Sequence, residues 1–344
     1  MIADLLNYLV DMTGIFIGVG IFILVGIALL KHGADGLVSG SSNLGLRMGI
    51  STVLTGLTIV AFGTSAPELV VSTVTAIQGR PEICLGNVIG SNLANTALIL
   101  GISALIAPIA IHKKTIKKEG LHSFFAILLV LVLAIFGSTL SRLDGIILLS
   151  VFVGWMVWLV LGARKARKAE GVPDVVFHPR HWSVDLLFTG LGLLGLVFGA
   201  NFLVEGAILS AKTLGVPDVF VGLTVVAVGT SLPELAVSIV AAMEGKVELT
   251  VGNVFGSNIF NALLILGVCC VIQPISFIQS LPSVPETLEG LSPQTISIDL
   301  PFTVLVCGLI IPLMAHKLML SRAKGLLLLL VYFGFMTYLV LRMM

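Results

Sequence analysis

Two glutamates stand at matching places within long apolar stretches of the chain. Glu68 follows Pro67 in the sequence GTSAPE, and Glu234 follows Pro233 in GTSLPE. Ionisable side chains inside apolar segments are costly, and they usually mark the path of an ion or a proton. Two carboxylates would neutralise one divalent cation. A plainer interpretation is that both acids are protonated and bonded to neighbouring hydroxyls, or that they favour the dipole of the following helix.

Hydroxyl and amide side chains accompany the two glutamates. Two trios recur at intervals of four residues, which places each trio on one helical face: Asn87, Ser91 and Asn95, and Asn253, Ser257 and Asn261. We expect Ser65 and Ser231 to be ligands as well, whereas four further hydroxyls are expected only to pack or to bond back to the helix: Thr58, Thr224, Ser72 and Ser238. An all-oxygen set without His or Cys predicts a hard cation such as Ca²⁺. Hydrogen bonding between helices alone would also explain the trios.

The backbone beside each glutamate is predicted to leave the helix. Pro67 cannot donate to the carbonyl of Gly63, and its ring clashes with that carbonyl; Pro233 stands in the same relation to Gly229. Each break falls near the middle of an apolar segment. Within a membrane, free backbone carbonyls are tolerated only where they line a cavity or bind something.

The composition requires a membrane. The chain has 344 residues, of which 57% are hydrophobic and 11% charged, with a mean hydropathy of +1.12, which excludes an ordinary soluble domain. The first residues lack a basic region, so we expect no cleaved signal peptide. The four cysteines show no metal-binding spacing, and we interpret them as small hydrophobic residues. Four glycines are expected to let helices approach closely: Gly86, Gly90, Gly252 and Gly256.

Hydropathy predicts about ten transmembrane helices in an all-α integral membrane fold. They are expected at 14–44, 49–78, 83–106, 121–139, 143–162, 184–211, 217–244, 249–272, 298–316 and 323–342. Most of the 19 Lys and Arg residues then fall on one side, and only Arg80, Arg142, Lys212 and Arg342 on the other. The positive-inside rule makes the first side cytoplasmic and both termini extracellular. Segment 273–297 is expected to be a polar loop.

The chain contains an internal repeat at an offset of 166 residues. Segment 56–101 recurs at 222–267 with 28 identities in 46 aligned positions. Five spans in each half is an odd number, so the two copies must enter the membrane from opposite sides, and transporters built this way bind their ions where such copies meet. We therefore expect a first five-helix repeat at 1–162, a cytoplasmic connecting loop at 163–183, and a second, inverted repeat at 184–344.

The doubled GTSxPE and GNxxGSN motifs resemble those of the cation/Ca²⁺ exchanger superfamily, and most of all the compact prokaryotic Na⁺/Ca²⁺ exchangers. The resemblance covers nearly the whole chain. It implies a ten-helix fold with an ion-binding core of helices 2, 3, 7 and 8, against which helices 1 and 6 slide. It also implies a prokaryotic cell membrane, transported Ca²⁺ and Na⁺, no cofactor, no nucleic acid and no obligatory protein partner.

The same resemblance assigns ion ligands residue by residue. The carboxylates of Glu68 and Glu234 and the backbone carbonyls of Thr64 and Thr230 would bind Ca²⁺. The sodium ligands would be Ser65, Ser231, Ser91 and Ser257, with the carbonyls of Ala61 and Ala227. Asn95 and Asn261 would lie at the bottom of the pocket; K⁺-dependent relatives carry Asp at the place of Asn261, which argues against K⁺ co-transport.

The leading prediction is a secondary active, electrogenic antiporter that exchanges Na⁺ for Ca²⁺ by alternating access, not an enzyme. The nearest alternative is an antiporter that exchanges H⁺ for Ca²⁺ or another divalent cation. Proton-coupled relatives typically carry Asn at the place of the motif serine, whereas this chain keeps serine in both copies. An intramembrane hydrolase with the two glutamates as acid and base, and a passive cation channel, are more distant alternatives.

Overall fold

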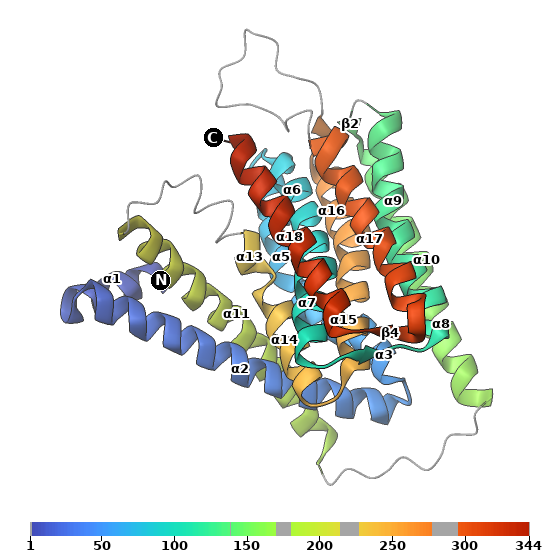
Figure 1. The fold of residues 1–344 in the computed structure, drawn as a ribbon, viewed down its shortest axis with the longest axis horizontal. Helices are drawn as coiled ribbons and strands as arrows, with labels where there is room; N and C mark the ends of the chain where they lie inside the picture. The colour runs from blue at the N-terminus through green and yellow to red at the C-terminus, as the bar shows by residue number, and fades with distance from the viewer. Residues whose placement is uncertain (1, 138, 170–179, 214–226, 277–294, 344) are drawn as a thin grey trace.

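The computed structural model describes residues 2–137, 139–169, 180–213, 227–276 and 295–343. Its elements are nearly all helices, as the hydropathy predicts (Figure 1). Several spans contain a π-helical turn, labelled η, between two α-helical stretches. Eight described helices are long and apolar enough to cross a membrane, and one bent pair makes a ninth. The start of the predicted span 217–244 and most of the loop 273–297 lie outside the described residues.

The first half contains these elements in chain order: α1 (Ile2–Thr13), α2 (Ile15–Met48), α3 (Thr52–Thr55), η1 (Gly56–Val60), α4 (Ala61–Thr64), α5 (Ala66–Ile77), α6 (Pro81–Leu93), η2 (Ala94–Ile99), α7 (Leu100–Ile106), β1 (Ile109–Ala110), α8 (Lys113–Thr115), η3 (Ile116–Gly120), α9 (Leu121–Phe136), β2 (Thr139–Leu140) and α10 (Arg142–Ala169). Helix α1 was not predicted, and it packs against α2. Helix α10 continues past the predicted end at residue 162.

The second half follows the same plan: α11 (Trp182–Thr213), α13 (Ala227–Thr230), α14 (Leu232–Met243), α15 (Val247–Ile259), η5 (Phe260–Ile265), α16 (Leu266–Ile272), β3 (Ile275–Ser276), η7 (Thr295–Asp299), α17 (Leu300–Ala315), the 3₁₀ turn η8 (His316–Leu318), β4 (Met319–Leu320) and α18 (Arg322–Met343). The short strands are a small departure from the all-α prediction. Each pair joins the two halves, since β1 pairs with β4 and β2 with β3, both antiparallel.

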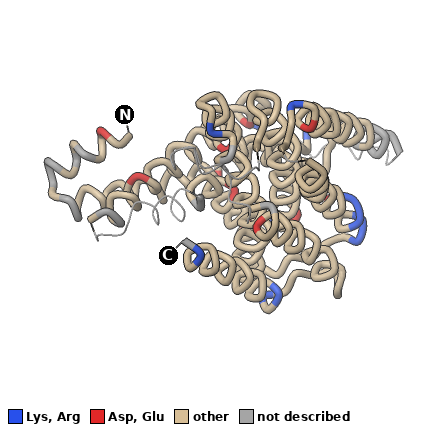
Figure 2. Tube along the Cα trace, turned by 90° about the horizontal axis from the view of Figure 1, so that it is seen from above, with Lys and Arg blue, Asp and Glu red and all other residues tan. Residues whose placement is uncertain are grey.

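Two spans form the centre of the bundle. In the most apolar window of α6–η2–α7, 78% of the residues are buried, and the same share holds for α15–η5–α16. The corresponding shares for α2, α10 and α11 are between 17% and 33%, so these helices present much of their surface to lipid. Seen from above, most of the chain is neither basic nor acidic, and several acidic positions lie inside the outline of the bundle (Figure 2).

Helices α2 and α11 lie side by side and cross the rest of the bundle obliquely (Figure 1). Glycine allows the close approach, because a Cβ on Gly33 would lie 2.7 Å from the backbone nitrogen of Leu196. At one end, Arg47 forms an ion pair of 2.9 Å with Asp185, whose side chain is fully buried. The Asn43 amide donates to the same carboxylate at 3.0 Å. These contacts make the two helices a single packed unit.

Candidate ion-binding site

Both predicted helix breaks are present. Helix α4 ends at Thr64 and α5 begins at Ala66, with a bend of 44° between the two stretches. Ser65 lies at the bend with φ −82° and ψ 3°. Ser231 separates α13 from α14 with a nearly identical φ of −90° and ψ of 5°. Proline at the start of a helix explains the geometry, since it needs no hydrogen bond there and cannot complete the preceding turn.

The bends place the two glutamates at the first turns of α5 and α14. Helix α5 contacts η5 and α16 of the second half, and α14 contacts η2 and α7 of the first half. The helix that follows the GTSxPE motif in each half therefore packs against the π-turn and the following helix of the other half. The hydroxyl of Ser65 donates to Oε1 of Glu234 at 3.2 Å, so groups from both breaks meet directly.

Both carboxylates are buried, and their oxygens are poorly satisfied by the protein. Glu68 and Glu234 are each only 1% exposed. Among the described residues, neither oxygen of Glu68 and only one oxygen of Glu234 has a hydrogen-bond partner. Buried polar atoms are normally paired. Unpaired carboxylate oxygens in the interior are what a site for a cation requires.

The asparagines at the bottom of the predicted pocket lie on π-helical turns. Asn95 belongs to η2 and Asn261 to the matching turn η5, and each side chain is 1% exposed. Neither amide has a hydrogen-bond partner within the described chain. A π-turn inserts an extra residue into the helix and often occurs at functional sites. The spacing of the asparagines predicted a shared helical face and did not reveal the π-turns.

Two threonines connect the breaks to the neighbouring spans in a symmetric way. Thr64 Oγ1 donates to the Asn253 carbonyl oxygen at 3.2 Å, and Thr230 Oγ1 donates to that of Asn87 at 3.3 Å. In each case, the asparagine amide then donates to a serine, Ser238 or Ser72, at 3.3 Å and 3.0 Å. Each chain of bonds therefore holds the broken helix of one half against the helix that carries the GNxxGSN motif of the other half, α15 or α6.

The remaining predicted ligands are less symmetric. Ser231 donates to Ser91 at 3.4 Å. The hydroxyl of Ser257, which matches Ser91 in the repeat, has no partner among the described residues. The Ala61 carbonyl accepts the backbone amide of Ser65 at 3.0 Å. Ala227 begins α13, and its side chain lies outside the described part.

The hydroxyls expected to have no ligand role are engaged elsewhere. Thr58 bonds back to the Leu54 carbonyl at 2.7 Å, and Ser72 and Ser238 accept the asparagine amides; Thr224 lies outside the described residues. The packing role of Gly252 and Gly256 is confirmed, because a Cβ on Gly252 would lie 2.3 Å from the Val53 carbonyl oxygen. By the repeat, Gly86 and Gly90 would contact residues near 219–223, and these residues lie outside the described part.

Two pairs of residues have contacts that were not expected from the sequence. Asn87 and Asn253 belong to the polar trios, and they also bond to the motif threonines. Asn92 and Asn258, the final residues of the two GSN motifs, are at most 2% exposed. Asn258 donates to Thr96 at 2.9 Å, and Asn92 has no partner among the described residues. The signal was the exact repetition of both asparagines at the offset of 166.

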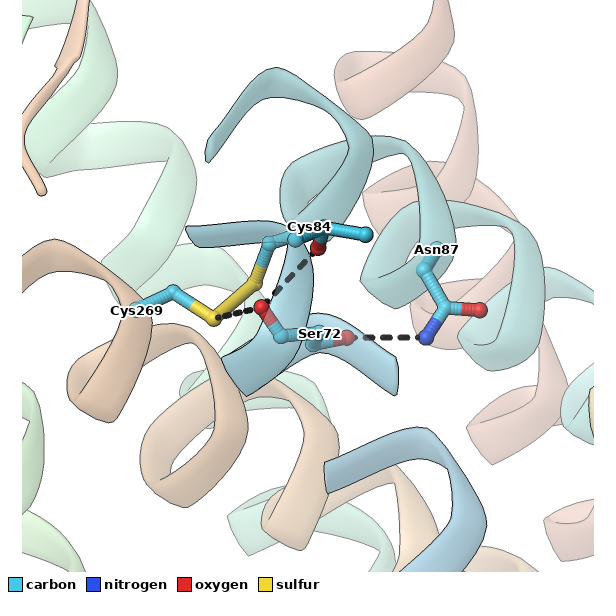
Figure 3. The surroundings of a disulfide bond; sticks show 5 residues. Ser72, Cys84, Asn87 and Cys269 are labelled. Carbon is cyan, nitrogen blue, oxygen red and sulfur yellow. Dashed lines mark hydrogen bonds between the residues drawn. A yellow bond between two sulfur atoms is a disulfide. The ribbon is translucent and has the colours of Figure 1, made fainter. Parts of the chain in front are cut away.

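The interpretation of all four cysteines as small hydrophobic residues was wrong for two of them. Cys84 on α6 and Cys269 on α16 form a disulfide, with a Cα–Cα distance of 6.7 Å. Ser72 lies between this disulfide and Asn87: its carbonyl oxygen is 3.3 Å from the Cys269 sulfur, and its hydroxyl accepts the Asn87 amide (Figure 3). Cys270 and Cys307 are buried free thiols. The disulfide joins the two central spans beside Ser72, which lies one helical turn after Glu68 on α5.

The donor chemistry of the site suits a hard cation. No group of three or more His, Cys, Asp or Glu side chains able to hold a metal ion occurs in the described ranges. The site instead combines two carboxylates with hydroxyl, amide and carbonyl oxygens. Such a set fits Ca²⁺ or Na⁺, which bind oxygen, and lacks the nitrogen and sulfur ligands that zinc or copper prefers.

Comparisons with known proteins agree with this class of site. Residues 18–161 and 184–341 match the family described as sodium/calcium exchanger protein. The chain is 39% identical over 267 residues to CaxA of Alkalimonas amylolytica, covering 74% of this chain and 81% of that protein. It is 31% identical over 292 residues to sodium/calcium exchanger MaX1 of Methanosarcina acetivorans, covering 74% and 83%.

A solved structure of the sodium-calcium exchanger NCX_Mj, soaked with Na⁺ and Sr²⁺, has a similar fold. The TM-score is 0.76 at 30% sequence identity, and the match covers 93% of this chain and 98% of that one. The fold and the site thus define a multi-pass membrane transporter, not an enzyme. The chain belongs to the sodium/calcium exchanger family, and the prediction of a helical membrane fold of the Na⁺/Ca²⁺ exchanger type is confirmed.

Proposed function

We propose that this cation/Ca²⁺ exchanger couples Ca²⁺ movement to Na⁺ and binds both ions at the crossing of its two broken helices. The carboxylates of Glu68 and Glu234 and the carbonyls of Thr64 and Thr230 bind Ca²⁺. The hydroxyls of Ser65, Ser91, Ser231 and Ser257, with the carbonyls of Ala61 and Ala227, bind Na⁺. The buried and unpartnered oxygens of Glu68 carry this proposal.

Sodium coupling rests on the neutral oxygens around the carboxylates. A proton needs only a titratable carboxylate, whereas Na⁺ needs a shell of oxygen ligands. Serine stands at both helix breaks, and its hydroxyl is such a ligand. MaX1, one of the relatives described above, is itself named a sodium/calcium exchanger.

The deciding experiment is uptake of radioactive Ca²⁺ into vesicles that contain the purified protein. Uptake is driven in one arm by an outward Na⁺ gradient, and in the other by a pH gradient without Na⁺. We expect uptake only in the first arm. Uptake with the pH gradient alone would replace the sodium proposal with H⁺/Ca²⁺ exchange, the second candidate.

Exchange is expected to be electrogenic. Two carboxylates balance one Ca²⁺, whereas three Na⁺, the number that the family resemblance implies, would leave the site positive. A net charge therefore crosses the membrane in each cycle and responds to voltage by about 2.3 kcal/mol per charge per 100 mV. A potassium diffusion potential imposed on the vesicles should change Na⁺-driven Ca²⁺ flux, and a flux indifferent to voltage would contradict this stoichiometry.

The proposed arrangement is two inverted repeats, at 1–162 and 184–344, joined by a cytoplasmic segment at 163–183 in a prokaryotic cell membrane, with both termini outside. The distribution of Lys and Arg supports this orientation. The disulfide supports it too, because Cys84 and Cys269 lie toward the span ends opposite the lysine-rich segment 113–118, and disulfides persist in oxidising compartments. Labelling of an introduced terminal cysteine by an impermeant reagent in intact cells tests the orientation.

A further inference from the structure

A groove opens on the surface of the bundle between α9, α10 and α15–η5. Its volume is about 630 Å³, and nearly all of its wall is apolar. The sides are formed by residues of α9 and α10, two helices whose most apolar windows are only 33% and 17% buried. Since both helices belong to membrane spans, the groove faces the hydrocarbon of the bilayer and not water.

The length of the groove matches one lipid tail. Its lining on α9 runs from His122 to Val132, and on α10 from Trp158 back to Val151. Ten residues of helix rise about 15 Å, which is half of the roughly 30 Å hydrocarbon core. The groove therefore extends from one edge of the membrane to about its middle plane, the depth that an acyl chain of one leaflet occupies.

Positive charge gathers at the shallow end of the groove. The Lys118 ammonium lies 5.2 Å from the centre of the Trp158 ring, and the His122 ring meets the same indole edge-on at 4.8 Å. Three further exposed lysines precede Lys118, namely Lys113, Lys114 and Lys117. The acids nearby are Glu119 in the same segment and Glu248, which pairs with His112 at 3.3 Å. A basic cluster next to a membrane span attracts anionic headgroups, by about 1 kcal/mol for each charge.

The floor of the groove belongs to the span that carries the second half of the ion site. Ile259 and Leu263 line it, and Asn261 lies between them in the sequence, on η5. Trp155 also lines the groove and packs edge-on against Phe260, with ring centres 6.5 Å apart. An occupant of the groove thus contacts the π-turn that positions Asn261.

We infer that this groove binds one anionic phospholipid, with an acyl chain between α9 and α10 and its phosphate beside Lys118. The lipid comes from the leaflet that faces the lysine-rich segment 113–118. The bound chain supports η5 from outside, so the lipid composition of that leaflet acts on the ion site through Phe260. This inference concerns a second site, and it stands whichever ion is coupled to Ca²⁺.

Tryptophan fluorescence gives a direct test, because two of the three tryptophans of the chain line the groove. The third, Trp182, lies at the start of α11 and is removed by Trp182→Phe. This variant is reconstituted in phosphatidylcholine vesicles with a small, fixed fraction of lipid brominated on the acyl chain. The brominated lipid is phosphatidylglycerol in one arm and phosphatidylcholine in the other. We expect quenching to favour phosphatidylglycerol by at least about fivefold, which is the effect of a single lysine charge.

Gly154 allows the groove to be filled without disturbing the protein. It lines the groove, and a Cβ built on it has no heavy atom within 4 Å. Gly154→Leu should therefore fold normally and reduce quenching by brominated phosphatidylglycerol to the level of phosphatidylcholine. The matched control is Gly334→Leu on α18, where a Cβ is equally unhindered but which does not line this groove. This control should keep the full preference.

Lys118→Gln distinguishes the contribution of the lipid headgroup from that of the acyl chain. It should lower the preference for phosphatidylglycerol about fivefold, because one of the four lysine charges at this end is lost, while the open groove still admits the acyl chains of both lipids. Each variant is compared with its own emission in unbrominated lipid, since loss of Lys118 also changes the surroundings of Trp158. Equal quenching by the two lipids before any groove substitution would overturn the proposal, as would a preference that survives Gly154→Leu.

Discussion

The two helix breaks have the same sequence motif and backbone shape but different hydrogen bonds. In the second half, Glu234 accepts the Ser65 hydroxyl of the first half at 3.2 Å. In the first half, neither oxygen of Glu68 has a partner among the described residues. The serines differ as well, since Ser231 donates to Ser91, whereas the hydroxyl of Ser257 is unpartnered within the same ranges.

This difference shows that sequence symmetry does not require equal halves in one site. The threonine bonds to Asn253 and Asn87 are symmetric because they connect backbone elements related by the repeat. The groups around the ions come from both halves, and the counterpart of Ser65, Ser231, donates to Ser91 and not to Glu68. We therefore expect the groups around the ions to be unequal in function and the symmetric bonds to be nearly equal.

The largest effect is expected from the carboxylates. Glu68→Gln and Glu234→Gln each remove one of the two charges without changing the volume of the side chain. Disrupting a buried charge interaction costs about 3–5 kcal/mol, so Ca²⁺ exchange should fall at least about a hundredfold. The measurement is Na⁺-driven Ca²⁺ uptake by each purified variant in vesicles.

The control for both variants is an unchanged elution profile in size-exclusion chromatography. Glu68→Gln should leave the fold intact, because the Glu68 side chain makes no hydrogen bond with the described residues. A folded variant of either glutamate that transports Ca²⁺ near the original rate would show that the carboxylates are misassigned.

A smaller and unequal effect is expected from the motif serines. Ser65→Ala removes a hydroxyl that donates to a carboxylate, and Ser231→Ala removes one that donates to another hydroxyl. A bond to a charged group is worth about 1.5–3 kcal/mol, and a neutral one about 1 kcal/mol. The Na⁺ concentration for half-maximal exchange should rise about tenfold or more in the first variant and about fivefold in the second. Equal shifts would mean that the asymmetry of the two breaks has no functional weight.

The smallest effect is expected from the symmetric threonines. Thr64→Val and Thr230→Val keep the shape of the side chain and remove the bonds to Asn253 and Asn87. Each change should lower the free energy of unfolding by about 1 kcal/mol, with the larger loss at Thr64, which is only 1% exposed. Thermal unfolding in detergent measures both. A clearly larger loss at Thr230 would contradict this order.

The sequence predicted those features of the site that depend on local chemistry. Proline after a glycine and a serine is enough to locate each helix break, and hydropathy places Glu68 and Glu234 inside the membrane. The π-turns at Asn95 and Asn261 could not be found this way, because an extra residue in a helical turn leaves the polarity pattern almost unchanged. Nor could the partner of Ser65, which depends on how the two halves cross.

The disulfide escaped prediction for a different reason. Internal repetition was the strongest guide to the site, and the two cysteines have no counterparts in it: the positions matching Cys84 and Cys269 are Thr250 and Ser103. Nothing in the spacing of the cysteines singled out a pair 185 residues apart. Only the packing of α6 against α16 brings them together.

That disulfide also imposes an order on biosynthesis. Cys84 is made 185 residues before Cys269, so at about 5–20 residues per second it waits roughly 10–40 s for its partner. Until α16 has been inserted beside α6, every nascent chain carries Cys84 as a thiol. The bond therefore marks chains in which both halves have been synthesised and docked, and a pulse of thiol-reactive reagent would separate young molecules from mature ones.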